Sequence, residues 1–303
     1  MISDKEIVCP NNLLDVAHKK KDVTAAIVNA GKPLPMLSVM DAVNENLIIP
    51  TFIGDEKEII KCADDLKFDI SNFKIINEPD ENSTAKIAAK LASKEEIKII
   101  VKGHIHTDVL MKEILKREYN LLGKTRLSHI WHMTLEKEDK PFIITDGALN
   151  VLPNLKTKMH ILKNAVKFCN RIGINRPKVS VLSATEEVLE SVQSSLDAKE
   201  ITEMALKENL NADIFGPLAF DNSVSKKSAA IKGIKNEVAG HADVLLVPNI
   251  EAGNALVKMM IYFMGACAAG VVVGGKVPVV ITSRSDEASA RLASMAAAVV
   301  ALD

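Results

Sequence analysis

The chain has 303 residues, of which 48% are hydrophobic and 25% charged, a profile typical of globular proteins with about two domains. Its 38 lysines and arginines nearly balance 39 aspartates and glutamates, so a net charge of -1 supplies no field that would attract nucleic acid or an anionic membrane. The N-terminal segment lacks the apolar core of a signal peptide, and no apolar run approaches the roughly 20 residues of a membrane span. These features predict a cytoplasmic protein without nucleic-acid or membrane partners.

Short β-rich runs alternate with amphipathic helical stretches along the chain. This alternation predicts an α/β protein with a largely parallel sheet, and the lack of period-two patterning is typical of strands covered on both faces. The predicted strands are Thr24–Val28, Ile48–Ile53, Phe73–Ile76, Ile97–Val101, Ile130–Thr134, Phe142–Thr145, Val179–Leu182, Val244–Val247, Gly270–Val273 and Pro278–Thr282. The clearest helical patterns are Glu56–Leu66, Ser83–Leu91, Val109–Arg117, Leu155–Arg171, Ala198–Glu208, Ala252–Phe263 and Asp286–Leu302.

One loop is dense in charge and marks a domain boundary. It spans Glu136–Lys140 and directly precedes the predicted strand at Phe142. No Pro- or Ser-rich linker, internal repeat or low-complexity tract offers another place to divide the chain. We therefore expect one domain to end near residue 138 and the next to begin near residue 139.

Two junctions between a strand and a helix carry polar residues where anions can bind. In Val244–Asn254 a buried strand leads to a helix that begins near Glu251, and in Pro278–Glu287 a strand delivers Ser283 and Arg284 to the last helix. In open parallel sheets, ligands bind outside the carboxyl ends of strands, where helix N-termini present free N–H groups. A guanidinium group at such a place fits a phosphate.

Simpler explanations exist for these polar residues. Ser283 and Asp286 fit a helix N-cap with a partner in the first turn, although a cap alone would not require the cation of Arg284 at a dipole end that repels it. Arg126, in the basic element Gly123–Arg126, fits a solvated surface residue as well as a ligand contact.

Other patterns carry weaker signals. Gly270–Lys276 has the glycine spacing of a P-loop, but Val277 stands where magnesium would need Ser or Thr. His104 and His106 can share one face of an extended segment, but no residue with ligand spacing completes a metal site. The four scattered cysteines fit reduced thiols rather than a disulfide frame or a metal site: Cys9, Cys62, Cys169 and Cys267.

Seven segments in order carry a resemblance to one family. They are Val101–Thr107 (VKGHIHT), Thr125–His129 (TRLSH), Thr145–Asn150 (TDGALN), Gly216–Ser225 (GPLAFDNSVS), Val238–Asp243 (VAGHAD), Val247–Asn254 (VPNIEAGN) and Thr282–Asp286 (TSRSD). Together they resemble the phosphate acetyltransferase/phosphate butyryltransferase family, most closely its butyryltransferase branch. Gly147 and Leu149 depart from the family's T-D-A-A-M-N pattern, in which Ala and Met occupy these places. The likeness is strong over roughly residues 95–303 and weaker before them.

The resemblance implies the two-domain fold of the isocitrate and isopropylmalate dehydrogenases, with the active site in the interdomain cleft. In that fold the chain crosses over and returns, so we expect a first α/β domain from residues 1–138 and 276–303 and a second from residues 139–275. Members of the family form homodimers, which implies a homodimer here.

The resemblance also implies a reaction: reversible transfer of a short acyl group between coenzyme A and inorganic phosphate. Coenzyme A is then a substrate, and neither a metal nor a further cofactor is needed. Asp286 would be the base for the thiol, although the acetyl branch carries its aspartate one turn later, where this chain has Ala290. Ser283 would donate to the oxyanion, and Arg284 and Arg126 would hold the phosphoryl group. The matched motifs supply four further expected substrate contacts: Lys102, His106, Glu251 and Asn254.

Several alternatives stay open at this point. The acyl group is expected to be butyryl-like, and acetyl is the first alternative. An acyl-ACP:phosphate acyltransferase shares the chemistry but would need a basic docking face, and no basic cluster is evident in the sequence. An NAD- and metal-dependent dehydrogenase would need an aspartate cluster that Asp146, Asp213 and Asp243 do not form in sequence. A non-catalytic binder of coenzyme A or acyl phosphate is the alternative of a different class.

Overall fold

The computed structural model describes residues 2–135, 140–282 and 286–303, and the chain divides into two compact units. Unit 1 comprises Met1–Glu6 with Thr125–Ala268, and unit 2 comprises Ile7–Lys124 with Ala269–Asp303. Most of the expected boundary loop Glu136–Lys140 lies outside the described residues. The domain limits expected from the sequence, at residues 138/139 and 275/276, stay a prediction.

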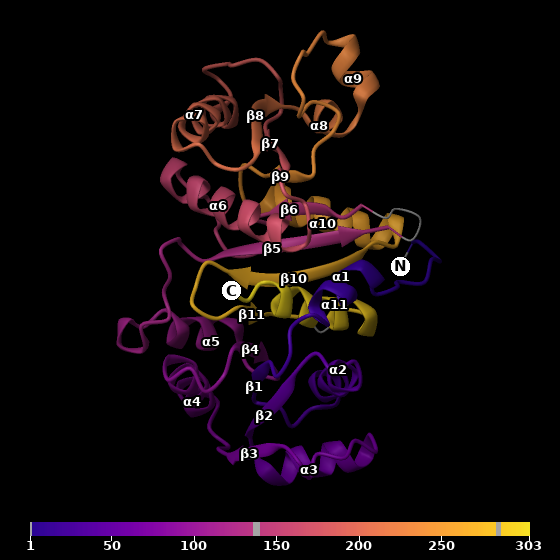
Figure 1. The fold of residues 1–303 in the computed structure, drawn as a ribbon, viewed down its shortest axis with the longest axis vertical. Coiled ribbons are helices and arrows are strands. Elements are labelled where there is room, and N and C mark those ends of the chain that lie inside the picture. Colours follow the sequence, from indigo (N-terminus) through magenta and orange to yellow (C-terminus); the bar gives the residue numbers. More distant parts are fainter. Residues whose placement is uncertain (1, 136–139, 283–285) are drawn as a thin grey trace. The chain divides into compact units, whose positions relative to one another are not determined.

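Unit 2 is built on parallel strands covered by helices on both faces. Its strand order is β3-β2-β1-β4-β11, all parallel, and β10 (Cys267–Val273), which begins in unit 1, runs antiparallel to β11. In Figure 1, α4 and α5 lie on one side of these strands, with α2 and α3 on the other. The strands are β1 (Thr24–Val28), β2 (Ile49–Gly54), β3 (Lys74–Asn77), β4 (Ile99–Lys102) and β11 (Val279–Val280). The helices are α1 (Asn11–Ala17), α2 (Pro33–Asn44), α3 (Glu56–Asp65), α4 (Glu81–Ser93), α5 (Thr107–Ile114), the short 3-10 helix Arg117–Tyr119 and α11 (Ala288–Val300).

Unit 1 has strand order β5-β6-β9-β7-β8, parallel except for the antiparallel pair β5–β6. In Figure 1, α6 and α7 lie on one side of these strands and α10 on the other. The strands are β5 (Ser128–Thr134), β6 (Phe142–Thr145), β7 (Lys178–Leu182), β8 (Asp213–Leu218) and β9 (Val244–Leu246). The helices are α6 (Leu155–Arg171), α7 (Gln193–Glu208), α8 (Phe220–Val224), α9 (Lys226–Ile231) and α10 (Ile250–Met264). The predicted α/β class with a largely parallel arrangement is therefore confirmed.

The predicted elements recur with shifts of a few residues at their ends, but the sequence did not reveal helix α2 or one of the strands. This strand, β8, contains Gly216 and Pro217, which mask a strand pattern, and it ends the strand order, where proline's missing N–H is tolerated. The last helix begins at Ala288 with Glu287 as its N-cap, not at Asp286 as predicted. Asp286 therefore stands one residue before the N-cap position.

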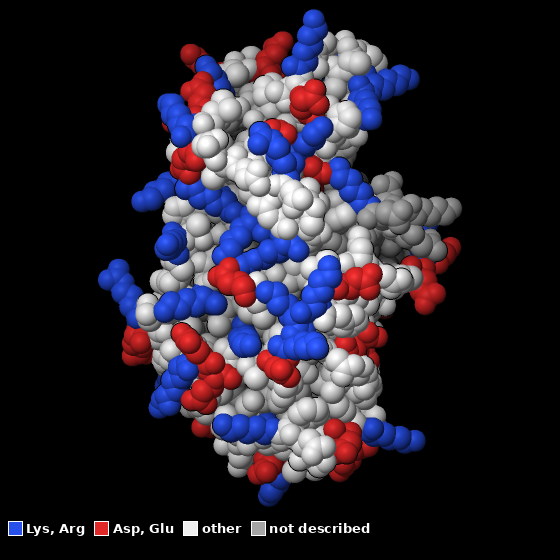
Figure 2. Space-filling view, viewed as in Figure 1, with Lys and Arg blue, Asp and Glu red and all other residues white. Residues whose placement is uncertain are grey.

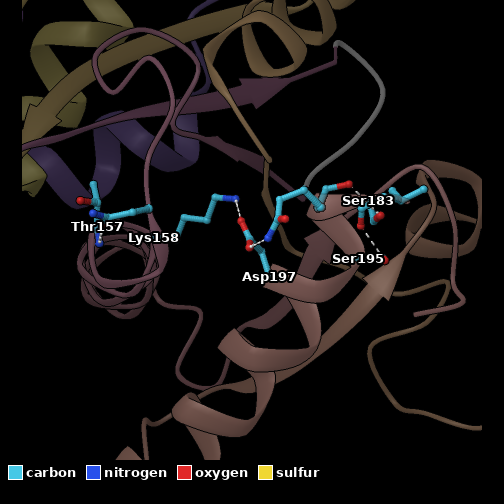
Figure 3. A network of polar contacts seen from close by, with 9 residues as sticks. Thr157, Lys158, Ser183, Ser195 and Asp197 are labelled. Carbon is cyan, nitrogen blue, oxygen red and sulfur yellow. Dashed lines mark hydrogen bonds and ion pairs between the residues drawn. The ribbon is translucent and has the colours of Figure 1, made fainter. Parts of the chain in front are cut away.

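A buried ion pair joins α6 to α7 in unit 1. Lys158 is only 4% exposed, and its Nζ lies 2.7 Å from Oδ2 of Asp197 (Figure 3). The other oxygen of Asp197 accepts a hydrogen bond of 2.8 Å from Gln193. Removal of either charge would leave its partner buried and uncompensated, so the pair fixes how these two helices pack.

Burial accounts for the cysteines and for much of the apolar composition. All four cysteines are buried, and burial raises the pKa of Cys169 and of Cys267 to about 12. Such thiols stay protonated near neutral pH and pack as small core residues. Across the described part of the chain, no helix has both the length and the apolar character that crossing a membrane requires.

Candidate active site

Unit 2 contains a cavity of about 450 Å³ at the carboxyl ends of β1 and β4. Residues after β1 (Asn29 and Lys32), at the end of β4 (Lys102) and after β11 (Thr282) line it, as does His106 at the start of α5. This is the edge of a parallel sheet where ligands bind. The structure thus brings Lys102 and His106, both expected substrate contacts, to one cavity with the residue that precedes Ser283.

The loop after β4 packs directly on the backbone that follows β1. Gly103 donates its N–H to Val28 O over 2.8 Å, and a Cβ added at Gly103 would lie 2.4 Å from the same oxygen. Asn29, at a φ of 59°, donates from Nδ2 to the carbonyl of His104 over 2.6 Å. Only glycine allows this approach, so Gly103 fixes where Lys102 and His106 stand in the cavity wall.

His106 is tied to α4 by a carboxylate. Oε1 of Glu81 accepts from the backbone N–H of His106 over 2.6 Å and lies 2.8 Å from its ring Nδ1. The hydrogen bonds from the His106 backbone and ring lower the pKa of Glu81. The contact fixes the ring with Nε2 directed away from Glu81. In the described residues, no three His, Cys, Asp or Glu side chains gather into a group that could hold a metal ion.

The predicted catalytic segment follows Thr282. Ser283 and Arg284 lie outside the described residues, so their roles stay predictions. Asp286 is described: it is partly exposed and lies two residues before α11. Asp286 belongs to unit 2, in the segment that joins β11 to α11.

Unit 1 carries a second polar constellation, organised by a buried aspartate. Asp146 follows β6 and is 2% exposed. Its Oδ1 accepts from the N–H groups of Ala148 (3.0 Å) and Leu149 (2.9 Å), and its Oδ2 accepts from the N–H of His129 (3.0 Å) and from Nδ2 of Asn150 (2.6 Å). A buried carboxylate with this many donors determines the shape of the loop Asp146–Asn150.

Asn150 in turn holds Arg126. Oδ1 of Asn150 accepts from Nε of Arg126 over 3.0 Å, and Nδ1 of His160 accepts from the Arg126 backbone N–H over 3.0 Å. The carbonyl of Arg126 accepts from Asn164 over 2.9 Å. Arg126 is exposed, its backbone is fixed at the N–H and the carbonyl, and its guanidinium is held at Nε by Asn150. The contact with Asn150 distinguishes it from a freely solvated surface arginine.

The N-terminus of α10 lies against the same loop. Asn249 caps this helix, because its Oδ1 accepts from the N–H of Ala252 over 2.9 Å. A Cβ added at Gly253 would lie 2.7 Å from Cα of Gly147, so the two backbones touch. Nδ2 of Asn254 lies 3.4 Å from the carbonyl of Gly147, and Glu251 is exposed in the first turn. The predicted contacts Arg126 and Asn254 therefore meet on one loop of unit 1.

Cations gather near Arg126. Figure 2 shows Lys and Arg side chains over the part of this face that α6 occupies in Figure 1, and α6 contains four lysines, one arginine and no acidic residue. Burial lowers the pKa of His160 on α6, and the nearby charges of Lys163, Lys156 and Arg126 lower it further. The sequence had suggested no basic cluster; on α6, Lys158 is buried in its pair with Asp197 and Lys163 pairs with Glu208, so the other basic residues of the helix contribute most to this surface.

Sequence reasoning missed several members of both constellations. Asn29 and Glu81 did not stand out, and Asp146 and Asn150 were noticed only within a motif. Asn29 directly follows a strand, and that position was the available signal for it. The role of Asp146 depends on backbone N–H donors such as those of Leu149 and His129. These donors lie apart in sequence and converge on the carboxylate only in the folded unit.

The chain is thus an α/β protein with cationic and polar side chains at the carboxyl ends of its strands. The family described as phosphate acetyl/butaryl transferase matches residues 80–299. The phosphate acetyltransferase of Rickettsia typhi is 38% identical over 285 residues, 93% of this chain and 82% of that protein. The phosphate butyryltransferase of Clostridium acetobutylicum is 35% identical over 92% of this chain and 94% of that protein.

Solved structures agree with these relatives. A branched-chain phosphotransacylase from Enterococcus faecalis V583 superposes with a TM-score of 0.82 at 33% identity, over 92% of this chain and 98% of that one. The chain belongs to the phosphate acetyl/butyryl transferase family. It is therefore a transferase enzyme, as the motifs implied.

Proposed function

We propose that this enzyme transfers a short acyl group reversibly between coenzyme A and inorganic phosphate: acyl-CoA plus phosphate gives acyl phosphate plus CoA. The observation that carries the proposal is the unit 2 cavity, where Lys102 and His106 meet Thr282, the residue before Ser283 and Arg284. A cavity with cations beside a segment of serine, arginine and aspartate suits a phosphorylated acyl substrate and a thiol.

In the direction that consumes acyl phosphate and forms acyl-CoA, the CoA thiolate attacks the carbonyl carbon of the acyl phosphate. The new carbon–sulfur bond forms as the bond between that carbon and the phosphate oxygen breaks, and inorganic phosphate leaves with the electron pair. Asp286 takes the thiol proton, since a free thiol with a pKa near 8.5 is largely protonated at neutral pH. Ser283 donates to the developing oxyanion, a contact worth about 2.7–4 kcal/mol when such a donor is lost.

The remaining predicted residues bind the substrates. Arg284 and Arg126 hold the phosphoryl group, and Lys102 and His106 complete the anion site. Glu251 and Asn254 contact the substrate from the α10 end. Coenzyme A is a substrate, and the cationic side chains supply the positive charge that a metal would otherwise provide. The fixed geometry of Arg126, held through Asn150 by Asp146, supports its role as a phosphate ligand.

We place the active site in a cleft between two domains of an isocitrate/isopropylmalate dehydrogenase-like fold, formed by residues 1–138 with 276–303 and by residues 139–275. Each unit carries its own set of expected substrate contacts at strand ends, Lys102 and His106 in one and Arg126 in the other, which supports a site that draws on both.

We also propose a homodimer. Supporting this is an exposed apolar face on α10, where Met259 and Tyr262 are 42% and 40% exposed and Phe263 is 62% exposed. With Ala255, these residues recur at the spacing of one helix face, and few protein surfaces leave such a face uncovered. Sedimentation of the protein would test the dimer, and Phe263→Glu should yield monomers if α10 forms the interface.

For the acyl group we propose a preference for four or five carbons. The butyryl-branch motifs support it, whereas the relatives named for acetyl and butyryl transfer are similarly identical to this chain and favour neither. Two extra buried methylenes would favour butyryl over acetyl by about 15-fold in kcat/KM. The measurement is phosphate-dependent release of CoA from acyl-CoAs of two to six carbons. A ratio in favour of acetyl would overturn the butyryl assignment, and no release with any acyl-CoA would overturn the reaction.

The same assay tests the anion site. Arg284→Ala should lose most of the activity in a folded protein, because it removes a charge-assisted contact worth about 1.5–3 kcal/mol. Near wild-type kinetics in this variant would remove Arg284 from the site. An acyl-ACP substrate belongs in the same panel, since the basic surface over α6 is the feature that such a carrier would need.

A further inference from the structure

One wall of the unit 2 cavity is apolar and belongs to no motif. It consists of Pro33, Leu34 and Pro35, at the start of α2, and Ile105 lines the same cavity. Leu34 is 46% exposed, which makes it an uncovered large apolar side chain at a binding cavity. Covering such a side chain with an apolar part of a ligand is favourable.

The backbone of this wall is fixed. Both flanking prolines have a restricted φ, and the carbonyl of Leu34 accepts from Oγ of Ser38 over 2.9 Å and from Nη1 of Arg291 over 3.2 Å. Ser38 and Arg291 are both 5% exposed, so neither bond is on the solvent side. The leucine is thereby held by two helices, α2 and α11, and the second of these directly follows the Thr282–Asp286 segment.

The cavity is therefore amphiphilic. The apolar wall lies in the same cavity as Lys102, at the end of β4, and Lys32, whose Nζ pairs with Glu58 over 3.1 Å. The substrate of the proposed reaction has the same two-sided character, because an acyl phosphate joins a doubly charged head to an apolar chain. With the head held by the cations, the chain is left for the apolar wall.

We propose that Leu34 is a specificity-determining residue that contacts the acyl chain of the substrate. The assignment rests on the proposed function and adds to it the residue that determines which acyl chain lengths the enzyme prefers. A shorter side chain at residue 34 leaves room for further methylenes, and a longer one removes room. The pantetheine arm of CoA is the competing occupant of this wall, and it is common to all acyl-CoA substrates.

The test compares Leu34→Ala and Leu34→Phe with the wild-type enzyme on acyl-CoAs of two to six carbons at saturating phosphate. We expect Leu34→Ala to raise the kcat/KM ratio of hexanoyl-CoA to butyryl-CoA, and Leu34→Phe to lower it, by about fourfold for each methylene gained or lost. Leu115→Ala is the matched control: it also removes an exposed leucine of unit 2, at 48% exposure, but does not line the cavity. This control should keep the wild-type ratios.

Three outcomes would overturn the assignment. Unchanged ratios in both Leu34 variants would remove Leu34 from the acyl site. An equal loss across all chain lengths would assign the wall to the pantetheine arm. A wild-type enzyme that releases no CoA from any substrate would end the proposed function, and the role of Leu34 with it. Melting temperatures of the variants identify any loss that comes from unfolding.

Discussion

The two units hold their candidate substrate groups in different ways. In unit 1, Arg126 is positioned by hydrogen bonds that lead through Asn150 to the buried carboxylate of Asp146. In unit 2, Lys102 and His106 are positioned by backbone packing at Gly103 and by the exposed pair of His106 with Glu81. In unit 1, the position of Arg126 and the stability of the fold therefore depend on the same buried carboxylate. In unit 2, the backbone that carries Lys102 and His106 is set by packing at Gly103.

The contrast is clearest for two aspartates. Asp146 is buried among N–H donors, while Asp286 is partly exposed before the cap of α11. Because an amide oxygen accepts hydrogen bonds and caps helices as a carboxylate does, Asp286→Asn should affect chemistry more than folding. The same substitution at Asp146 should affect folding first.

The largest effect on turnover is expected for Asp286→Asn. Loss of the proposed general base should lower kcat by about 10²–10⁴-fold, while the melting temperature stays within about a degree or two of wild type. The measurement is CoA release beside thermal unfolding of the same preparation. Equal losses of activity and stability would show that Asp286 is structural and would erase the distinction between the two aspartates.

Asp146→Asn should instead destabilise the protein. An amide in place of the carboxylate would face at least two N–H donors with its own NH₂ group, at about 1–3 kcal/mol for each donor left unsatisfied. We expect the free energy of unfolding in urea to fall by about 2–6 kcal/mol, with a raised KM for phosphate as Arg126 loses its position. Asp80→Asn in unit 2 is the control, since Asp80 caps α4 and asparagine caps equally well. A urea midpoint like that of wild type would mean that Asp146 does not organise the loop.

A smaller difference between the units should appear on acidification. Burial lowers the pKa of His129 and of His132 to about 4, although the charge of Asp146 partly offsets this for His129, whereas the histidines of unit 2 (His18, His104 and His106) are exposed. Since the folded-state pKa lies below the ordinary value near 6.5, the unfolded state binds protons first. Stability is then complete above pH 6.5 and falls as the pH drops toward 4, by about 1–2 kcal/mol per histidine between pH 7 and 5.

Trp131 provides the readout for this prediction. It is the only tryptophan in the chain, it lies on β5 in unit 1, and its ring centroid is 4.4 Å from that of His129. Urea unfolding followed by its fluorescence should shift to lower urea at pH 5, and His132→Phe should reduce that shift while His18→Gln leaves it unchanged. Equal midpoints at pH 7 and 5 would contradict the assigned burial of the two histidines.

Much of the fold could be predicted because apolar runs and helical periodicity are local. Strands such as β1 and β6 were predicted with their observed bounds, as was α6. The prediction missed elements in which proline and glycine hide the pattern. Helix α2 opens with Pro33-Leu-Pro35, which resembles a loop, and strand β8 contains Gly216-Pro217.

The site was predictable to the extent that strand ends mark it. Lys102 ends β4, His106 follows that strand, and both line the cavity. The donors that converge on Asp146, and the contact of Arg291 with Leu34, join residues far apart in sequence. No local pattern encodes such contacts, because burial and packing of whole elements decide them.

Because the backbones of Gly147 and Gly253 are in contact, the first turn of α10 and the loop that holds Arg126 should move together. A ligand or a neighbouring subunit that displaced that turn would therefore shift the loop and Asn150 with it. The displacement would be transmitted by backbone contact and not by a flexible side chain. The family pattern has alanine where this chain has Gly147, and a methyl group there would lie 2.8 Å from the backbone of Gly253. A methyl group at this position must therefore move the helix or the loop, so a substitution at Gly147 offers a way to adjust how firmly Arg126 is held.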